Sequence, residues 1–328
     1  MAPIYHDRSV NLPTQTDPPI PPHDTFQPLS CQNGIDTHNT NLPLPSIQLP
    51  HRISAYNKWG LKGLSTFYYC GESEKDRLYA VKIQHFASRA ETPIGPRPGL
   101  FLHGGPSTSS PIVAASGEEL LSPNEYVSRG PNTDLILLGS RDPSDGSDAS
   151  SSLLRARITH NGMVAFTFQA QVSTQQDLHH ELFSWIEIPK KSEPGFKRGG
   201  FKLARHPLKA QQGRVNRDPL SPERFWPSHD IRNEGEILAT LSYGRFWQIK
   251  SQVKMFTIQF TSEATLSNID DTLGRSILTT AAHLYQMKLV GMASPLGLEA
   301  AERRRTLHVY KSLSSNPARR QWATPFTT

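Results

Sequence analysis

The chain has 328 residues, 36% of them apolar, and its mean hydropathy is −0.49. These values are low for one compact domain of that length and indicate sizeable segments outside a packed core. The net charge of +6 permits contact with an anionic surface without requiring it. With only two cysteines, Cys31 and Cys70, the sequence excludes a framework of several disulfides.

The N-terminal residues predict a tail rather than a folded segment or a secretory signal. A basic n-region and an apolar h-region are both missing, so we expect a cytoplasmic or membrane-peripheral protein that is not secreted. Residues 1–50 contain ten of the 27 prolines. Such a segment buries too little apolar area to offset chain entropy, which predicts disorder. Pro18–Pro22 could instead form a polyproline II ligand, but no arginine or lysine flanks it.

From His51 onward, apolar and polar residues alternate, which is typical of strands with one buried and one wet face. The clearest segments are 77–84, 163–172 and 255–260. About a dozen short strands with turn residues between them favour a closed barrel or a sandwich. The other candidates are 51–57, 64–70, 99–103, 111–116, 134–139, 153–160, 181–188, 200–205 and 235–242.

One long helix is predicted from Leu273 to Met292, and it is apolar or small almost all the way round. A helix without a wide polar face has to be enclosed by protein or lipid. Enclosure by the preceding strands is favoured over a membrane span, because each charge at mid-bilayer costs roughly 3 kcal/mol. Gly291 and Pro295 are expected to end the helix. The predicted capping residues are Asn268, Asp270 and Asp271, and the polar interruptions are Arg275, His283, Gln286 and Lys288.

A set of strand and turn segments carries a resemblance to a known family. The segments are Tyr68–Glu72, Leu78–Val81, Leu100–Pro106, Ser110–Ala114, Phe183–Trp185, Leu203–Arg205, Gly235–Ala239 and Glu302–Arg305. Together they resemble the tubby C-terminal-like superfamily of tubby, LURP-one-related and scramblase-like proteins, in particular a fungal branch. The resemblance implies a mainly β (α+β) fold, a closed, roughly twelve-stranded antiparallel β-barrel around a central hydrophobic C-terminal helix. It covers the barrel domain at 51–308, and the residues that follow, 309–328, are separately expected to form a flexible tail.

A basic loop predicted at 189–233 is the feature that bears most directly on function. Basic residues there outnumber acidic ones, and each one near an anionic leaflet contributes about 1 kcal/mol. A loop that is merely solvated is the alternative. Nucleic acid is not expected as a specific partner, because no base-reading motif accompanies the charge. The candidate lipid-binding residues are Lys197, Arg198, Lys202 and Arg205.

These observations favour a non-enzymatic binding module over an enzyme. The leading hypothesis is a tubby-like module that binds an anionic, phosphoinositide-containing membrane surface through the basic loop. The alternative is a protein-interaction scaffold of unknown partner, with the tail or a strand edge as its docking element.

Two motifs resemble catalytic or metal sites. The His103-Gly104-Gly105 turn is similar to the oxyanion-hole turn of hydrolases, but no G-x-S-x-G nucleophile motif follows it. The His179-His180-Glu181 run lacks the second histidine of a zinc-binding helix and reads as the start of a strand. His283 is expected to be neutral and hydrogen-bonded within the core. We therefore predict no catalytic residue, no metal and no cofactor.

Overall fold

The computed structural model describes residues 47–58, 65–85, 91–119, 132–138, 150–173, 178–206, 235–244 and 252–303. Three predicted segments lie wholly or largely outside these residues. They are the disordered tail up to residue 46, the part of the basic loop from 207 to 233, and the C-terminal tail at 309–328.

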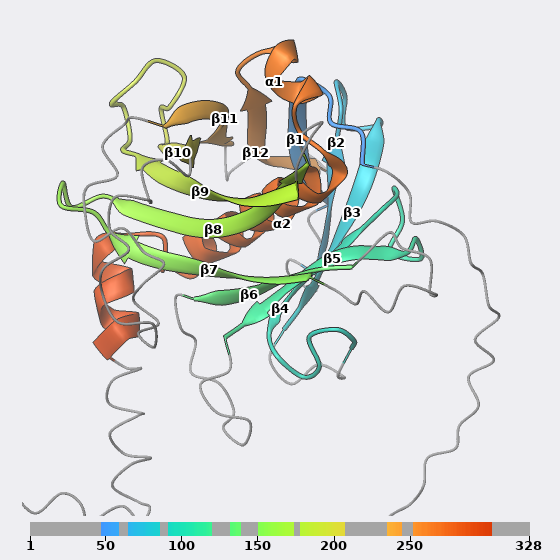
Figure 1. Cartoon of the computed structure of the whole chain (residues 1–328), viewed down its shortest axis with the longest axis horizontal. Helices are drawn as coiled ribbons and strands as arrows, with labels where there is room; N and C mark the ends of the chain where they lie inside the picture. The colour runs from blue at the N-terminus through green and yellow to red at the C-terminus, as the bar shows by residue number, and fades with distance from the viewer. Residues whose placement is uncertain are drawn as a thin grey trace, which may run out of the picture. The chain divides into compact units, whose positions relative to one another are not determined.

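Twelve strands in the described part form a closed antiparallel barrel (Figure 1). Each strand pairs with its neighbours in sequence, and β1 closes the barrel by pairing with both β2 and β12. This confirms the predicted barrel and excludes a sandwich. The strands are β1 (Arg52–Lys58), β2 (Thr66–Cys70), β3 (Arg77–Gln84), β4 (Gly99–His103), β5 (Ile112–Glu118), β6 (Thr133–Leu137), β7 (Ser150–Ile158), β8 (Val164–Ser173), β9 (Leu178–Ile188), β10 (Gly200–His206), β11 (Glu236–Tyr243) and β12 (Gln252–Phe260).

The alternation of apolar and polar residues decides which face of each strand points inward. On β3, Tyr79, Val81 and Ile83 are buried in the main core, and on β8 so are Phe166 and Phe168. Each predicted strand overlaps an observed one, and the ends differ by at most three residues. The core of the barrel is therefore built by the period-two pattern of the sequence.

Helix α2 (Asp271–Leu289) fills the barrel, as predicted, and packs against β4, β5, β6, β8 and β12 (Figure 1). Every residue from Leu273 to Tyr285 is buried. Two strands donate hydrogen bonds to the helix: Trp185 Nε1 donates to Thr280 Oγ1 at 2.9 Å, and the Tyr69 hydroxyl donates to the Leu278 carbonyl at 2.6 Å. Among the described residues, no helix has the length and hydropathy needed to cross a bilayer.

The ends of α2 follow from its capping residues. Asp270 is the N-cap, and its side chain accepts from the Leu273 N–H at 2.7 Å. Gly291, with φ of +76°, forms a Schellman turn in which the Met292 N–H donates to the Met287 carbonyl at 2.9 Å. The prediction for Asn268 was wrong, because that residue caps the end of the short helix α1 (Glu263–Ser267).

Two predicted boundaries also need correction. The tail predicted at 1–50 ends too late, because Ile47 is buried in the barrel core and the Tyr79 hydroxyl donates to the Gln48 carbonyl at 2.7 Å. The basic loop predicted at 189–233 is interrupted by β10, which lies between β9 and β11. Only residues 189–199 form a described turn there, and we call them the basic turn.

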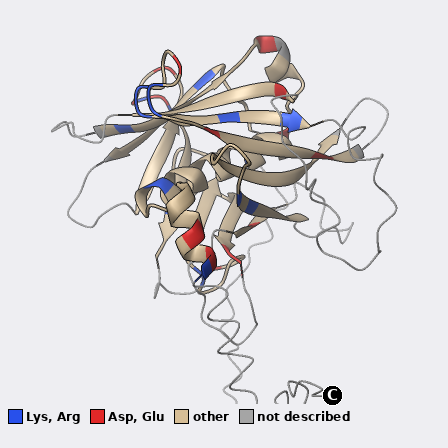
Figure 2. Ribbon diagram, turned by 90° about the vertical axis from the view of Figure 1, so that its left-hand side faces the viewer, with Lys and Arg blue, Asp and Glu red and all other residues tan. Residues whose placement is uncertain are grey.

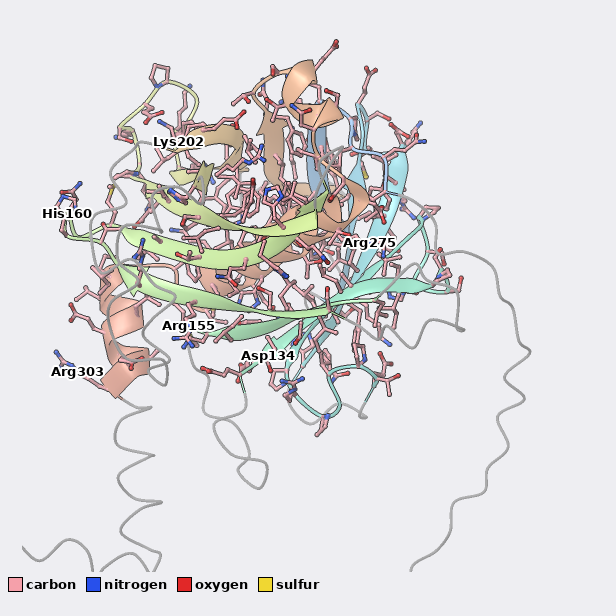
Figure 3. The ribbon with its side chains drawn as sticks, in the orientation of Figure 1. Asp134, Arg155, His160, Lys202, Arg275 and Arg303 are labelled. Carbon is pink, nitrogen blue, oxygen red and sulfur yellow. The ribbon has the colours of Figure 1, made fainter. Side chains whose placement is uncertain are left out.

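The two ends of the barrel differ in what they carry. We call the end at which α2 terminates the distal end, and it includes the β7–β8 turn and the basic turn. The Lys288 Nζ lies 5.4 Å from the ring of Tyr243, the last residue of β11, which places the end of α2 there. A further helical segment, 295–303, follows α2. His160 and Arg303 lie at this end, whereas Arg275 lies toward the other (Figure 3).

Candidate functional site

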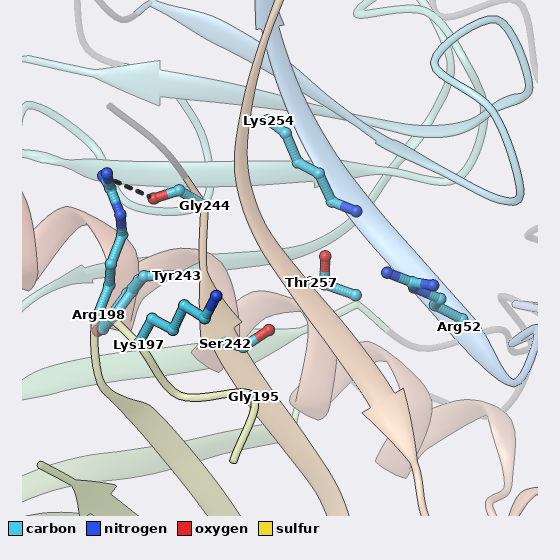
Figure 4. Close-up of a pocket in the computed structure, with 9 residues that line it drawn as sticks. All are labelled: Arg52, Gly195, Lys197, Arg198, Ser242, Tyr243, Gly244, Lys254 and Thr257. Atoms are coloured by element: carbon cyan, nitrogen blue, oxygen red, sulfur yellow. Dashed lines mark hydrogen bonds between the residues drawn. The ribbon is translucent and has the colours of Figure 1, made fainter. Parts of the chain in front are cut away.

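A groove of about 380 Å³ lies on the barrel beside the basic turn (Figure 4). Strands β1, β11 and β12 form its floor, and the basic turn forms one wall. Ser242 and Thr257 alternate with the core residues Leu241 and Phe256, so their side chains point outward into the groove. The lining residues are Arg52, Gly195, Lys197, Arg198, Ser242, Tyr243, Gly244, Lys254 and Thr257.

The backbone of the basic turn is held by glycines and one buried aromatic ring. A Cβ on Gly200 would lie 2.0 Å from the Leu241 carbonyl oxygen and 2.8 Å from the Phe196 ring, so only glycine fits there. Gly199 has φ of +77°, and its N–H donates to the Phe196 carbonyl at 3.0 Å. Phe196 is buried between the turn and the barrel, which leaves the adjacent Lys197 and Arg198 exposed above the groove.

Four cationic side chains line the groove, and none of the lining residues carries a carboxylate. Lys197 and Arg198 come from the basic turn, Arg52 from β1 and Lys254 from β12. The Arg198 Nη1 donates to the Gly244 carbonyl at 3.4 Å, which ties the basic turn to the residue after β11 (Figure 4). In the part of the chain that the structure describes, none of the four forms an ion pair.

The electrostatics of the groove favour a negative ligand. Burial, and after it the positive charge of Arg52, lower the pKa of Lys254. Neutral groups lie on the same face: the Tyr56 ring centroid lies 6.0 Å from the ammonium, and Ser54 and Thr257 share a hydrogen bond of 3.2 Å. An anion in the groove would offset this repulsion and accept charge-assisted hydrogen bonds from lysine and arginine.

The four residues predicted for lipid binding are divided by the structure. Lys197 and Arg198 line the groove. Lys202, on β10, instead pairs with Glu193 at 2.6 Å. Arg205, near the end of β10, donates to Glu181 at 2.7 Å and lies 3.7 Å from Glu236. Lys202 and Arg205 are therefore already neutralised and do not join the groove.

The Glu181 carboxylate belongs to a separate polar cluster. Burial alone would raise its pKa, but hydrogen bonds from Arg205 and His179 lower it below its usual value. His179 and Glu181 lie on strand β9, with His179 Nε2 2.8 Å from Glu181 Oε1. The predicted strand is confirmed here. Among the described residues, no group of three or more His, Cys, Asp or Glu side chains is placed to hold a metal ion.

The His103-Gly104-Gly105 turn joins β4 to β5 as a hairpin. The Gly104 N–H donates to the Pro111 carbonyl at 2.9 Å, and His103 Nδ1 lies 2.7 Å from the Ser110 carbonyl oxygen. The Gly105 carbonyl accepts from the Ala80 N–H at 2.8 Å. These groups hold the turn together, and the Gly104 N–H is not directed at a site where an oxyanion could form.

Sequence reasoning missed Arg52 and Lys254. Each falls in or beside a predicted strand, and each lies on the polar side of it. They come together only because β1 pairs with β12 to close the barrel, with Tyr56 opposite Lys254 and Arg52 opposite Gln259. The sequence does show a cation on the polar face of both the first and the last strand. That observation points to a shared site only if the pairing of these two strands is already known.

The known proteins compared with this chain give no guide to the ligand of the groove. Comparison with protein-family models, with curated proteins and with solved structures finds no match.

Proposed function

We propose that this chain is a non-enzymatic binding module that holds a phosphate group of an anionic membrane lipid in the groove lined by Arg52, Lys197, Arg198 and Lys254. The observation that carries the proposal is the convergence of these four cations with no carboxylate among the lining residues. Cations that lie close together without a carboxylate beside them repel one another. An anion that binds between them relieves this repulsion.

The chemistry of the lining suits phosphate. Guanidinium groups of Arg52 and Arg198 can donate paired hydrogen bonds to phosphate oxygens, and the two lysines add point charges. The Ser242 and Thr257 hydroxyls add neutral donors on the groove floor. The resemblance to the tubby C-terminal-like superfamily supports a phosphoinositide headgroup as the source of that phosphate.

Co-sedimentation with vesicles tests the proposal. The full chain is incubated with phosphatidylcholine vesicles that contain 0 or about 5 mol% phosphatidylinositol bisphosphate. With about 1 kcal/mol for each cation near the surface, Lys197→Ala/Arg198→Ala should weaken binding about 30-fold. The matched control Lys75→Ala/Lys202→Ala removes two charges as well, from an exposed turn and from the pair with Glu193, and should change binding less than threefold.

Two further arms identify the source of the phosphate. Phosphatidylserine vesicles of equal surface charge should bind more weakly than the phosphoinositide vesicles, and inositol trisphosphate in solution should compete with them. Equal binding to both vesicle types would show that the surface charge of the membrane, and not a phosphate site, drives binding. If the wild-type chain fails to sediment at low salt, or if the two double variants bind equally, the proposal is wrong.

A protein-interaction scaffold is the alternative function. Two docking elements were proposed for it. The described strands are all paired on both sides, so they leave no edge for strand addition. The proline-rich tail, up to residue 46, lies outside the described residues.

A further inference from the structure

The exposed large apolar residues of the described chain gather at one end of the barrel. There are four of them, with exposed fractions of 38% for Ile158, 41% for Leu289, 53% for Val290 and 79% for Leu296. Ile158 ends β7 next to the β7–β8 turn, and the other three lie at or just after the end of α2. All four therefore belong to the distal end.

The backbone at the end of α2 keeps three of these side chains outside the core. Val290 is the C-cap, and Gly291 then turns the chain through the Schellman hydrogen bond described above. Ala293 and Leu298 are buried and fix the segment to the barrel, so Leu296, which lies between them, points away from it. These positions are held in place by the fold and are not loose ends.

Exposed lysines lie at the same end of the barrel as these apolar residues. Lys190 and Lys191 are exposed on the basic turn, and Lys288 precedes Leu289 on the last turn of α2. Figure 2 looks onto the distal end and shows the basic residues of that turn in blue. Tyr243, over whose ring Lys288 lies, is also one of the residues that line the groove. The groove therefore reaches the distal end of β11.

We propose that the distal end docks on an anionic bilayer, with Leu296, Val290 and Leu289 entering the headgroup region while the groove holds a lipid phosphate. The inference rests on the proposed function and adds the orientation of the barrel on the membrane. Apolar side chains on separate turns, at an end of the barrel that also presents exposed lysines, fit a soft interface that accepts single side chains and attracts cations. A protein partner would be fitted better by a continuous apolar face.

An environment-sensitive dye at Leu296 tests the docking orientation. The full chain carries Cys31→Ser and Leu296→Cys, and the new thiol is labelled with NBD; Cys70 is fully buried and stays unlabelled. The matched control carries the label at Thr108→Cys, an exposed position in the β4–β5 turn at the opposite end. Addition of phosphoinositide vesicles should shift the emission of the Leu296 label to the blue and expose it to quenching by lipids spin-labelled near the headgroup. The Thr108 label should not change.

A second variant measures the contribution of the apolar side chains to binding. Val290→Ser/Leu296→Ser should weaken vesicle binding about tenfold, because apolar area is no longer transferred from water. It should leave competition by inositol trisphosphate unchanged, because the groove is intact.

The outcomes separate the two proposals. If the chain sediments with vesicles while the Leu296 label stays in water, the proposed phosphate groove stands and the proposed docking orientation is wrong. A chain that does not sediment overturns both. A blue shift that appears without vesicles and grows with protein concentration would show a second copy covering the distal end, and would also overturn membrane docking.

Discussion

At the scale of single residues, a buried histidine inside the barrel bears on stability. His283, on α2, is 4% exposed, and its Nε2 lies 2.8 Å from Thr133 Oγ1 on β6. Burial disfavours the imidazolium and lowers the pKa of His283 to about 4. The expectation of a histidine that is hydrogen-bonded within the core is confirmed, and its burial makes the residue a source of acid sensitivity.

His283 should make the folded state less stable as the pH falls. Its pKa is about 4 in the folded chain against an ordinary value of 6.5, so the unfolded chain takes up a proton between these values that the folded chain does not. Stability is therefore lost from about pH 6.5 downward and the loss is complete near pH 4, in total about 3 kcal/mol.

Urea unfolding of the wild type and of His283→Gln at several pH values measures this loss of stability. The wild type should lose about 3 kcal/mol more than the variant between pH 7 and pH 4. His206, whose pKa is also lowered to about 4, by burial first and then by Arg157, is present in both proteins and cancels. Parallel pH profiles for the two proteins would show that His283 is protonated in the folded barrel.

At the scale of elements, the strands and α2 could be predicted because each obeys a simple periodicity. A barrel wall with a helix inside and solvent outside imposes alternation on every strand, and the enclosed helix has apolar or small residues on all sides. Helix α1 was missed because five residues give no period to read, and Asn268 was consequently assigned to the wrong helix. The burial of Ile47 was missed because it precedes the first alternating segment.

The end of α2 depends on the left-handed conformation of Gly291. Its φ is +76°, and a Cβ there would meet no atom within 4 Å, so substitution tests the backbone alone. Gly291→Ala should lower the free energy of unfolding by about 1–2 kcal/mol. Gly291→Asn should cost less, because asparagine tolerates this region. Equal stability of wild type and Gly291→Ala in chemical denaturation would contradict the Schellman turn.

The start of α2 depends on Asp270. Its carboxylate accepts the Leu273 N–H at 2.7 Å, so Asp270→Ala should destabilise the chain by about 1 kcal/mol. Asp270→Ser keeps an acceptor oxygen and should restore most of that loss. Thermal unfolding of the three proteins provides the measurement, and an alanine variant as stable as the serine variant would rule out the capping role.

At the scale of the whole molecule, the groove is a product of barrel closure. Sequence reasoning found Lys197 and Arg198 by charge density, but the same criterion also selected Lys202 and Arg205, which pair with carboxylates in the folded chain. Glu193 neutralises Lys202 across the basic turn, and Glu181 pairs with Arg205 across two strands. Charge density in a sequence cannot separate free cations from paired ones, because pairing depends on which strands are neighbours.

Salt should weaken membrane binding in a way that depends on the groove. Exposed charges are screened over roughly 8 Å at physiological ionic strength, so raising the salt from 50 to 300 mM should reduce vesicle binding of the wild type steeply. Lys197→Ala/Arg198→Ala should show a shallower dependence in the same co-sedimentation series. If both proteins have the same salt dependence, these two cations do not contact the membrane charge.

The central claim is that Arg52 and Lys254, from the first and last strands, form one phosphate site with the basic turn. Isothermal titration of the full chain with inositol trisphosphate tests it most directly. The wild type should bind saturably, Arg52→Ala/Lys254→Ala should weaken binding about 30-fold or more, and Lys75→Ala/Lys202→Ala, with the same loss of charge, should bind as the wild type does. Equal weakening by the two double variants, or no binding by the wild type, would contradict the claim.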